Sequence, residues 1–199
     1  MTERIALIGV DIQNAFGSNG EIAVPGAETV VAPMNRAIEV ARSRNEQVYL
    51  TGDWHDKNSK HFKVNGGIWD IHAVAGSDSA KFLYGLDTAG SVIVHKGLDV
   101  NNPDGYTPWE DSLTDQDLTF AEQIKKDGIT TLVGGGLIYN VCVKLTLIGA
   151  ANRHLKTYIL TDAAPKLNLP KENSTLASRR QMERAEIKFI TVGDYVNGF

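Results

Sequence analysis

The sequence predicts a single α/β domain, residues 1–199, built as a three-layer α/β/α sandwich around a six-stranded, mostly parallel sheet. Short apolar runs of strand length alternate along the chain with segments of helical periodicity. Parallel strands need a crossover connection, usually a helix, so this alternation favours parallel pairing with helices on both faces of the sheet. A chain of 199 residues is long enough to bury one hydrophobic core.

Six apolar runs are expected to form the strands. Each has the length of a buried strand and is dominated by aliphatic, β-branched or aromatic residues. The runs span residues 4–10, 46–52, 91–95, 130–135, 157–161 and 187–192.

Helical segments lie between these runs, at residues 28–44, 119–127, 140–155 and 172–186. The first places Val31, Met34 and Ile38 on one face, as expected for an amphipathic helix that packs on a sheet. The last is polar enough to lie on the surface, with Asn173 or Ser174 as its candidate N-cap. The region 54–90, after the second apolar run, is less regular and rich in Gly, Asp and Ser, and we interpret it as a long functional loop.

Composition narrows the function classes and the cellular setting. The net charge of −4 is scattered along the chain, which disfavours a nucleic-acid partner. No apolar run approaches the roughly 18 residues of a membrane span, so no membrane partner is expected. A single cysteine cannot form an internal disulfide, and the start of the chain lacks a secretory pattern, which together favour a cytoplasmic location. A homo-oligomer is compatible with this composition.

Chemically active residues stand at the predicted strand ends. Asp11, Asp53 with His55, Lys96, and the turn leading to Cys142 each follow or end a strand. Ligands of open parallel sheets bind outside the carboxyl ends of the strands. We therefore expect these side chains to face one crevice.

Asp11, Lys96 and Cys142 form a set suited to acyl transfer. Lys96 and a helix N-terminus would lower the pKa of the thiol, and Asp11 would carry its proton to a leaving amine. Backbone N–H groups of the strand-to-helix turn would form an oxyanion hole. The alternative is structural: a lone buried cysteine is usually inert, Asp11 would then be a loop cap and Lys96 a surface charge.

Asp53, His55, His61 and His72 form a candidate metal site in the irregular region that follows the second strand. One carboxylate and three imidazoles suit Zn²⁺, Fe²⁺ or Mn²⁺. Their spacing matches no compact zinc motif, so His61 and His72 as ordinary loop histidines remain the alternative.

These residues occur along the chain in the same order as in a known family. Nearly the whole chain resembles the nicotinamidase/pyrazinamidase branch of the isochorismatase-like cysteine hydrolases. The resemblance is carried by the segments GVDIQNAF, DWHDKNSKHF, VHKG and GGLIYNVCVKLT. It implies metal-dependent hydrolysis of nicotinamide to nicotinic acid and ammonia through a cysteine thioester, with pyrazinamide as a second substrate. Such an activity belongs to NAD salvage, and its partner is a small molecule.

The resemblance also implies a role for each site residue. One divalent ion would be bound by Asp53, His55, His61 and His72. Zn²⁺ is the expected ion, with Fe²⁺ or Mn²⁺ as alternatives. The implied catalytic residues are Asp11, Lys96 and Cys142. The resemblance also implies a cis peptide between Leu137 and Ile138, and an oxyanion hole formed by the backbone amides of Ile138 and Cys142. The implied substrate contacts are Phe16, Trp69 and Tyr139.

Tyr139 and Asn140 depart from the Thr-Asp that usually precedes the cysteine in this family. The large Tyr139 is expected to reshape the pocket. Two other functions therefore stay open: an amidase of the same superfamily for a carbamoyl or ureido substrate, and a non-catalytic binder of pyridine metabolites in which Tyr139 blocks attack.

Overall fold

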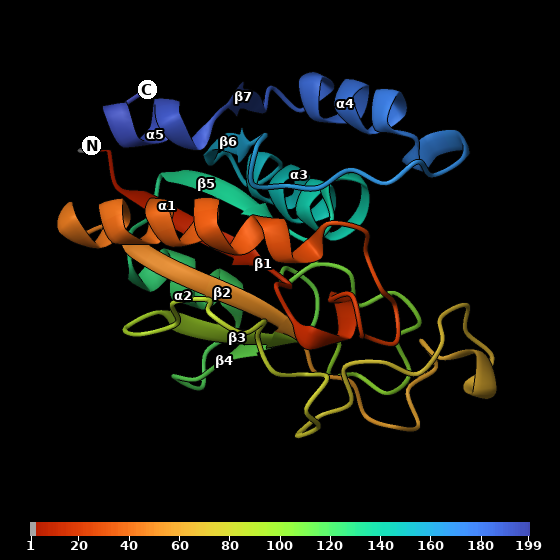
Figure 1. Cartoon of the computed structure of the whole chain (residues 1–199). Helices are drawn as coiled ribbons and strands as arrows, with labels where there is room; N and C mark the ends of the chain where they lie inside the picture. The colour runs from red at the N-terminus through yellow and green to blue at the C-terminus, as the bar shows by residue number, and fades with distance from the viewer. Residues whose placement is uncertain (1–2) are drawn as a thin grey trace.

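The computed structural model describes residues 3–199, which is the predicted domain without its first two residues (Figure 1). Its centre is a seven-stranded sheet in the order β4-β3-β2-β1-β5-β6-β7, parallel except for β4. The strands are β1 (Ile5–Val10), β2 (Gln47–Asp53), β3 (Val92–Lys96), β4 (Ser112–Thr114), β5 (Thr131–Gly136), β6 (Lys156–Leu160) and β7 (Lys188–Ile190).

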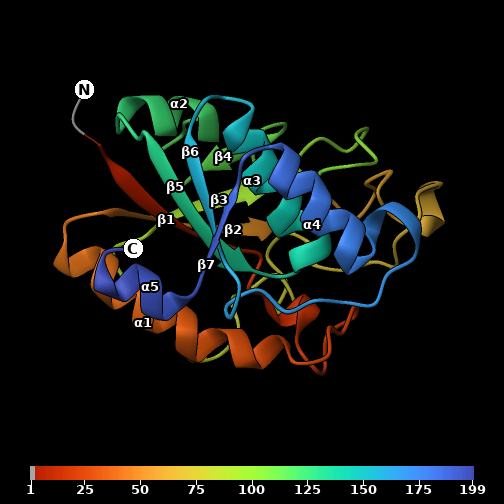
Figure 2. The same ribbon diagram turned by 90° about the horizontal axis from the view of Figure 1, so that it is seen from above.

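Helices cover both faces of the sheet, which confirms the three-layer prediction. Figure 2 shows α1 (Val31–Ser43) and α5 (Val192–Asn197) on one face, and α2 (Phe120–Lys126), α3 (Lys144–Ala151) and α4 (Thr175–Arg184) on the other. Successive strand residues point to opposite faces. Accordingly, Leu7 and Leu50 join the core beneath α1, whereas Ile8 and Tyr49 join the core beneath α2 and α3.

The predicted count of six strands is wrong by one edge strand. Each predicted run overlaps an observed strand, with ends that differ by at most two residues. The additional strand, β4, pairs antiparallel with β3, and its three residues alternate buried, exposed, buried. Three residues in a polar segment are too few to show periodicity, which is why the sequence pattern misses this strand.

The predicted helices are present with shifted boundaries. The segment 28–44 is α1 preceded by a 3-10 turn, and α4 begins after Ser174, whose side chain accepts a hydrogen bond from the backbone of Ala177. Ser174 rather than Asn173 is therefore the N-cap. The short α5 was not predicted, because it starts inside the last apolar run.

The chain order reverses at β1, which lies between β2 and β5. Such a switch point opens a crevice at the carboxyl ends of the two central strands. The connection between β2 and β3, residues 54–91, starts as a long irregular loop beyond those ends and then returns past α1 to the start of β3 (Figure 1). It carries only one 3-10 turn. None of the helices within residues 3–199 combines the length and the apolar character that a membrane span requires.

Candidate active site

A buried ion-pair network forms the floor of the crevice. Asp53 and Lys96 are register partners at the ends of β2 and β3, and their side chains form an ion pair. The Nζ atom of Lys96 also lies 3.0 Å from Oδ2 of Asp11, whose Oδ1 accepts a hydrogen bond from Thr51 at 2.7 Å. Burial alone would lower the pKa of Lys96, but the two carboxylates raise it well above its usual value, so Lys96 is charged.

Asp11 stands directly after β1 with a left-handed backbone, φ 50°, which Asp tolerates better than most residues. Burial raises its pKa to about 6, against the opposing charge of Lys96 and with the added repulsion of Asp53. A carboxyl group whose pKa lies this close to neutrality can both accept and return a proton.

Cys142 lies in a π-helical turn, Tyr139–Val143, that joins β5 to α3. Its side chain is partly exposed to the pocket. Burial raises the pKa of the thiol well above its usual value, Lys96 opposes this, and the Asp11 carboxylate adds to it. The expected lowering of the thiol pKa is therefore not found. The resting group is a thiol, which becomes a nucleophile only when a base takes its proton.

The turn before Cys142 contains the cis peptide between Leu137 and Ile138 that the family resemblance implied. Both residues and Cys142 line the same pocket. The oxyanion role of the Ile138 and Cys142 amides stays a prediction.

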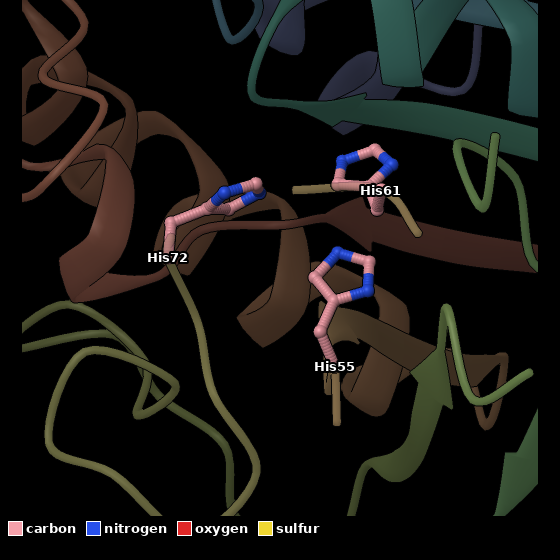
Figure 3. Close-up of side chains that lie close together, drawn as sticks. All are labelled: His55, His61 and His72. Carbon is pink, nitrogen blue, oxygen red and sulfur yellow. The ribbon is translucent and has the colours of Figure 1, made fainter. Parts of the chain in front are cut away.

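The three histidines of the candidate metal site form one buried cluster (Figure 3). One ring nitrogen of each lies within 4.8 Å of those of the other two. The Nδ1 atom of each ring meets a backbone carbonyl: Gly97 at 3.1 Å for His55, Pro103 at 2.8 Å for His61, and Asp70 at 2.7 Å for His72. Because a carbonyl only accepts, each Nδ1 carries the hydrogen and each Nε2 keeps a free lone pair, as in metal-ligating histidines.

The donor set fits a divalent ion. Within residues 3–199, no hydrogen-bond partner reaches the buried Nε2 of His55. Burial lowers the pKa of His55 to about 4 and also lowers that of His61, so both imidazoles are neutral at physiological pH, as metal binding requires. The Asp53 carboxylate lies 3.8 Å from Nε2 of His55 and 3.7 Å from Nε2 of His72, where it adds an anionic oxygen.

The pocket above these groups has a cavity volume of about 120 Å³ and opens to solvent. This volume is below the roughly 300–1,000 Å³ of pockets for drug-sized ligands, so the pocket suits a smaller molecule. It is lined by Phe16, Ile22, Val24, Asp53, His61, Trp69, His72, Gly105, Tyr106, Leu137, Ile138, Val141, Cys142, Leu167 and Leu169. The predicted aromatic pair, Phe16 and Trp69, is therefore in place.

Tyr139 does not line the pocket. Its side chain is 1% exposed and packs in the core beneath α3 and α4, with Nζ of Lys166 5.2 Å from the ring centre. Ile138 lines the pocket, whereas the next residue of the turn packs in the core. The expected substrate contact of Tyr139 is thus replaced by a packing role.

Two residues of the site were not assigned from the sequence. Gln13 fastens Asp53: its Nε2 donates to the Asp53 carbonyl at 2.9 Å, and its Oε1 accepts from the Asp53 amide at 2.8 Å. Tyr106 accepts a hydrogen bond from Nε1 of Trp69 at 2.9 Å. The position of Gln13 two residues after Asp11 was a usable signal, whereas Tyr106 belongs to a loop with no recognisable pattern.

A cysteine, a buried acid–lysine pair and a histidine cluster thus meet at the switch point of a parallel α/β sheet. This combination of groups at a switch point is compatible with a hydrolase of the α/β class. Residues 5–191 match the Isochorismatase domain, and the chain belongs to the isochorismatase family.

Several proteins similar to this chain are amide hydrolases. The chain is 29% identical over 209 residues to the nicotinamidase of Escherichia coli (strain K12), covering 96% of each chain. It is similar to the pyrazinamidase of Pyrococcus horikoshii in complex with zinc, with 25% identity, a TM-score of 0.80, and coverage of 94% of this chain and 99% of that one. The N-carbamoylsarcosine amidase from Thermoplasma acidophilum shares the fold, at 21% identity and a TM-score of 0.76 over 95% and 96% of the two chains. The protein is an isochorismatase-like amidohydrolase.

Proposed function

We propose that the protein hydrolyses nicotinamide to nicotinic acid and ammonia, and pyrazinamide to the corresponding acid. The observation that carries this proposal is the composition of one pocket. Cys142 and the buried Asp11–Lys96 pair supply groups for acyl transfer, and the aromatic side chains of Phe16 and Trp69 suit a flat ring. The similarity to nicotinamidases over nearly the full length supports the same substrate.

The first half-reaction transfers the acyl group to sulfur. As Sγ of Cys142 attacks the carboxamide carbon, Asp11 takes the thiol proton, and the backbone amides of Ile138 and Cys142 stabilise the charge on the oxygen. The C–N bond then breaks, Asp11 returns the proton to the departing nitrogen, and ammonia leaves a thioester on Cys142. Lys96 stays charged throughout and holds Asp11 in place.

The second half-reaction restores the enzyme. Asp11, again ionised, takes a proton from a water molecule that attacks the thioester carbon. The C–S bond breaks, the proton returns to Sγ of Cys142, and the carboxylic acid is released. A carboxyl pKa near 6 suits this repeated exchange in both directions.

The residues that would hold the divalent ion are His55, His61, His72 and Asp53. When bound, Zn²⁺, or alternatively Fe²⁺ or Mn²⁺, would act as a Lewis acid for the ring nitrogen of the substrate and so orient the carboxamide toward Cys142. The carbonyls behind each histidine fix the rings for this purpose.

The pocket disfavours the two competing functions. None of its lining residues, within the part of the chain that the structure describes, is Lys or Arg, so no lining side chain neutralises the carboxylate of an N-carbamoyl amino acid. A non-catalytic binder required Tyr139 to block attack, but Tyr139 lies outside the pocket. Both observations favour catalysis on an uncharged aromatic amide.

Ammonia release by the purified protein tests the proposal, with nicotinamide, pyrazinamide and N-carbamoylsarcosine as parallel substrates and Cys142→Ala as the blank. Release from the two ring amides alone is expected. Release from N-carbamoylsarcosine alone would assign the protein to the carbamoyl class. Binding of nicotinamide without any release would make it a binder. Size-exclusion chromatography of the same sample addresses the homo-oligomer, which stays a prediction.

A further inference from the structure

The outer wall of the pocket is aliphatic. Ile22 and Val24 come from the loop after β1, and Leu167 and Leu169 come from the long connection between β6 and α4 (Figure 2). We call residues 165–173 of this connection the strap. The two strap leucines give the pocket a wall that no catalytic or metal-site residue provides.

Asn140 holds the strap at two points. Its side chain is fully buried, its Nδ2 donates to the carbonyl of Asn173 at 2.8 Å, and its Oδ1 accepts from the amide of Leu167 at 2.9 Å. Both polar atoms of one amide are therefore used to tie the two ends of the strap to the turn that carries Cys142.

A second tether reaches the same end of the strap. Lys144, also buried, donates from Nζ to Oδ1 of Asn173 at 2.9 Å. Lys144 and Asn140 lie four residues apart, on one side of the helical segment that begins at the catalytic turn. The strap is thus fastened to the element that presents the nucleophile, and its leucines keep a fixed position relative to Cys142.

The side-chain chemistry of position 140 matters here. The amide of Asn140 donates at one atom and accepts at the other, which is what a carbonyl at Asn173 and an N–H at Leu167 require. An ionised carboxylate at this position could accept from Leu167 but could not donate to the Asn173 carbonyl. The two hydrogen bonds to the strap therefore require an amide side chain at position 140.

We infer that Asn140 is a positioning residue that determines specificity: by holding Leu167 and Leu169 in the pocket wall, it adapts the site to amides whose far end is uncharged and apolar. The inference rests on the proposed function and deepens it. Asn140 does not touch the reacting atoms, so its removal should weaken binding of the apolar part of a substrate more than it slows the chemical steps.

Asn140→Ala tests the inference, and Asn152→Ala is the matched control, since Asn152 is exposed at the end of α3. Loss of two buried hydrogen bonds should raise KM for nicotinamide about tenfold with kcat retained, whereas the control should keep both constants. Hydrogen exchange at the Leu167 amide should become faster in Asn140→Ala only. Lys144→Met, which removes one tether, should produce a smaller change in the same direction and replaces Asn140→Ala if that variant does not fold.

Alkylation of Cys142 gives a readout that does not depend on the substrate assignment. Cys142 is the only cysteine, so the mass of the intact protein reports its modification. The wild type should favour N-phenyliodoacetamide over iodoacetamide more strongly than free cysteine does, and Asn140→Ala should lose this preference. If the wild type releases no ammonia but shows this alkylation preference, and Asn140→Ala loses it, nicotinamide hydrolysis is refuted. The role of Asn140 in positioning the strap is then still supported. A lower kcat with unchanged KM, or an unchanged alkylation preference, would overturn the role of Asn140.

Discussion

The fold favours the protonated, uncharged forms of two neighbouring groups, the thiol of Cys142 and the carboxyl group of Asp11. Burial raises the pKa of both groups. The resting site therefore contains a thiol next to a carboxylate that is easily protonated, rather than a preformed thiolate–lysine pair. Lys96 is charged but already paired with Asp11 and Asp53, which limits what it offers to sulfur.

The pH dependence of turnover follows from this arrangement. Asp11 accepts a proton only when it is ionised, and its pKa in the folded protein is about 6. We expect kcat/KM to be constant above this pH and to fall as the pH decreases through about 6. A pH–rate profile of the wild type measures this directly. An acid limb near the ordinary pKa of Asp, about 3.9, would contradict the raised value.

Replacement of Asp11 should affect the chemical steps. Asp11→Asn preserves size but cannot accept the thiol proton, so kcat should fall by about 10²–10⁴-fold with little change in KM. Circular dichroism would establish that the variant is folded. A variant with normal kcat and weakened binding would remove Asp11 from the proton-transfer role.

Cys142→Ala should abolish turnover and retain nicotinamide binding, because the thioester requires sulfur but the aromatic and metal-site contacts do not. Calorimetric titration with nicotinamide measures the binding, and ammonia release measures the turnover. Residual turnover comparable to that of the wild type would exclude covalent catalysis by this residue.

At the scale of elements, the histidine cluster depends on the end of β3. Gly97 has a φ of 72°, and its carbonyl accepts the hydrogen bond from His55. A Cβ atom at this position would lie 2.3 Å from Cε1 of His55, so the backbone there approaches the imidazole more closely than any side chain permits. The conformation and the close approach both require glycine.

Gly97→Ala should therefore displace His55 and reduce the bound metal, measured per chain by elemental analysis. Gly90→Ala is the control: Gly90 also has a positive φ, 65°, but no atom lies within 4 Å of its added Cβ. The control should lose about 1 kcal/mol of stability from the backbone alone and keep its metal. Equal metal contents in the two variants would show that the close approach to His55 is unimportant.

The site elements differ in how far the sequence predicts them. Asp11, Asp53 and Lys96 end apolar strands, and strand ends of a parallel sheet converge, so their meeting could be predicted. Tyr106 and Leu167 reach the pocket from irregular segments whose course depends on tertiary contacts such as the Asn140 bonds. Tyr139 was misassigned because the direction of a side chain in a turn cannot be read from its neighbours.

At the scale of the whole molecule, the alternation of strands and helices was sufficient to predict the layers. This alternation did not predict the edge strand β4 or the C-terminal helix α5. The three residues of β4 are recruited by pairing with β3, and α5 is started by a capping box of Thr191 and Asp194 within an apolar run. Both are decided by tertiary pairing and local capping rather than by periodicity.

The bound ion should also stabilise the molecule as a whole. A ligand that binds only the folded state raises the free energy of unfolding, by about 2.7 kcal/mol at a free concentration 100 times its Kd. The long connection after β2 supplies His55, His61 and His72, so the ion would tie this irregular segment to the sheet. Chelation should lower the thermal midpoint of the wild type and of Cys142→Ala alike. His72→Ala should start lower and respond less, and an unchanged wild-type midpoint would argue against a resident ion.

The switch point at β1 has a consequence for how the protein is made. Ile5 in the first strand pairs with Thr131 in the fifth, so the centre of the sheet closes only when most of the chain is present. Contacts this distant in sequence form slowly, because a long loop must be closed before they contribute. Asp11 would emerge from the ribosome long before Cys142, at a time when the edge of β1 that pairs with β5 is still unpaired. The proposed nucleophile, Cys142, therefore meets its proposed base, Asp11, only as the central sheet is completed.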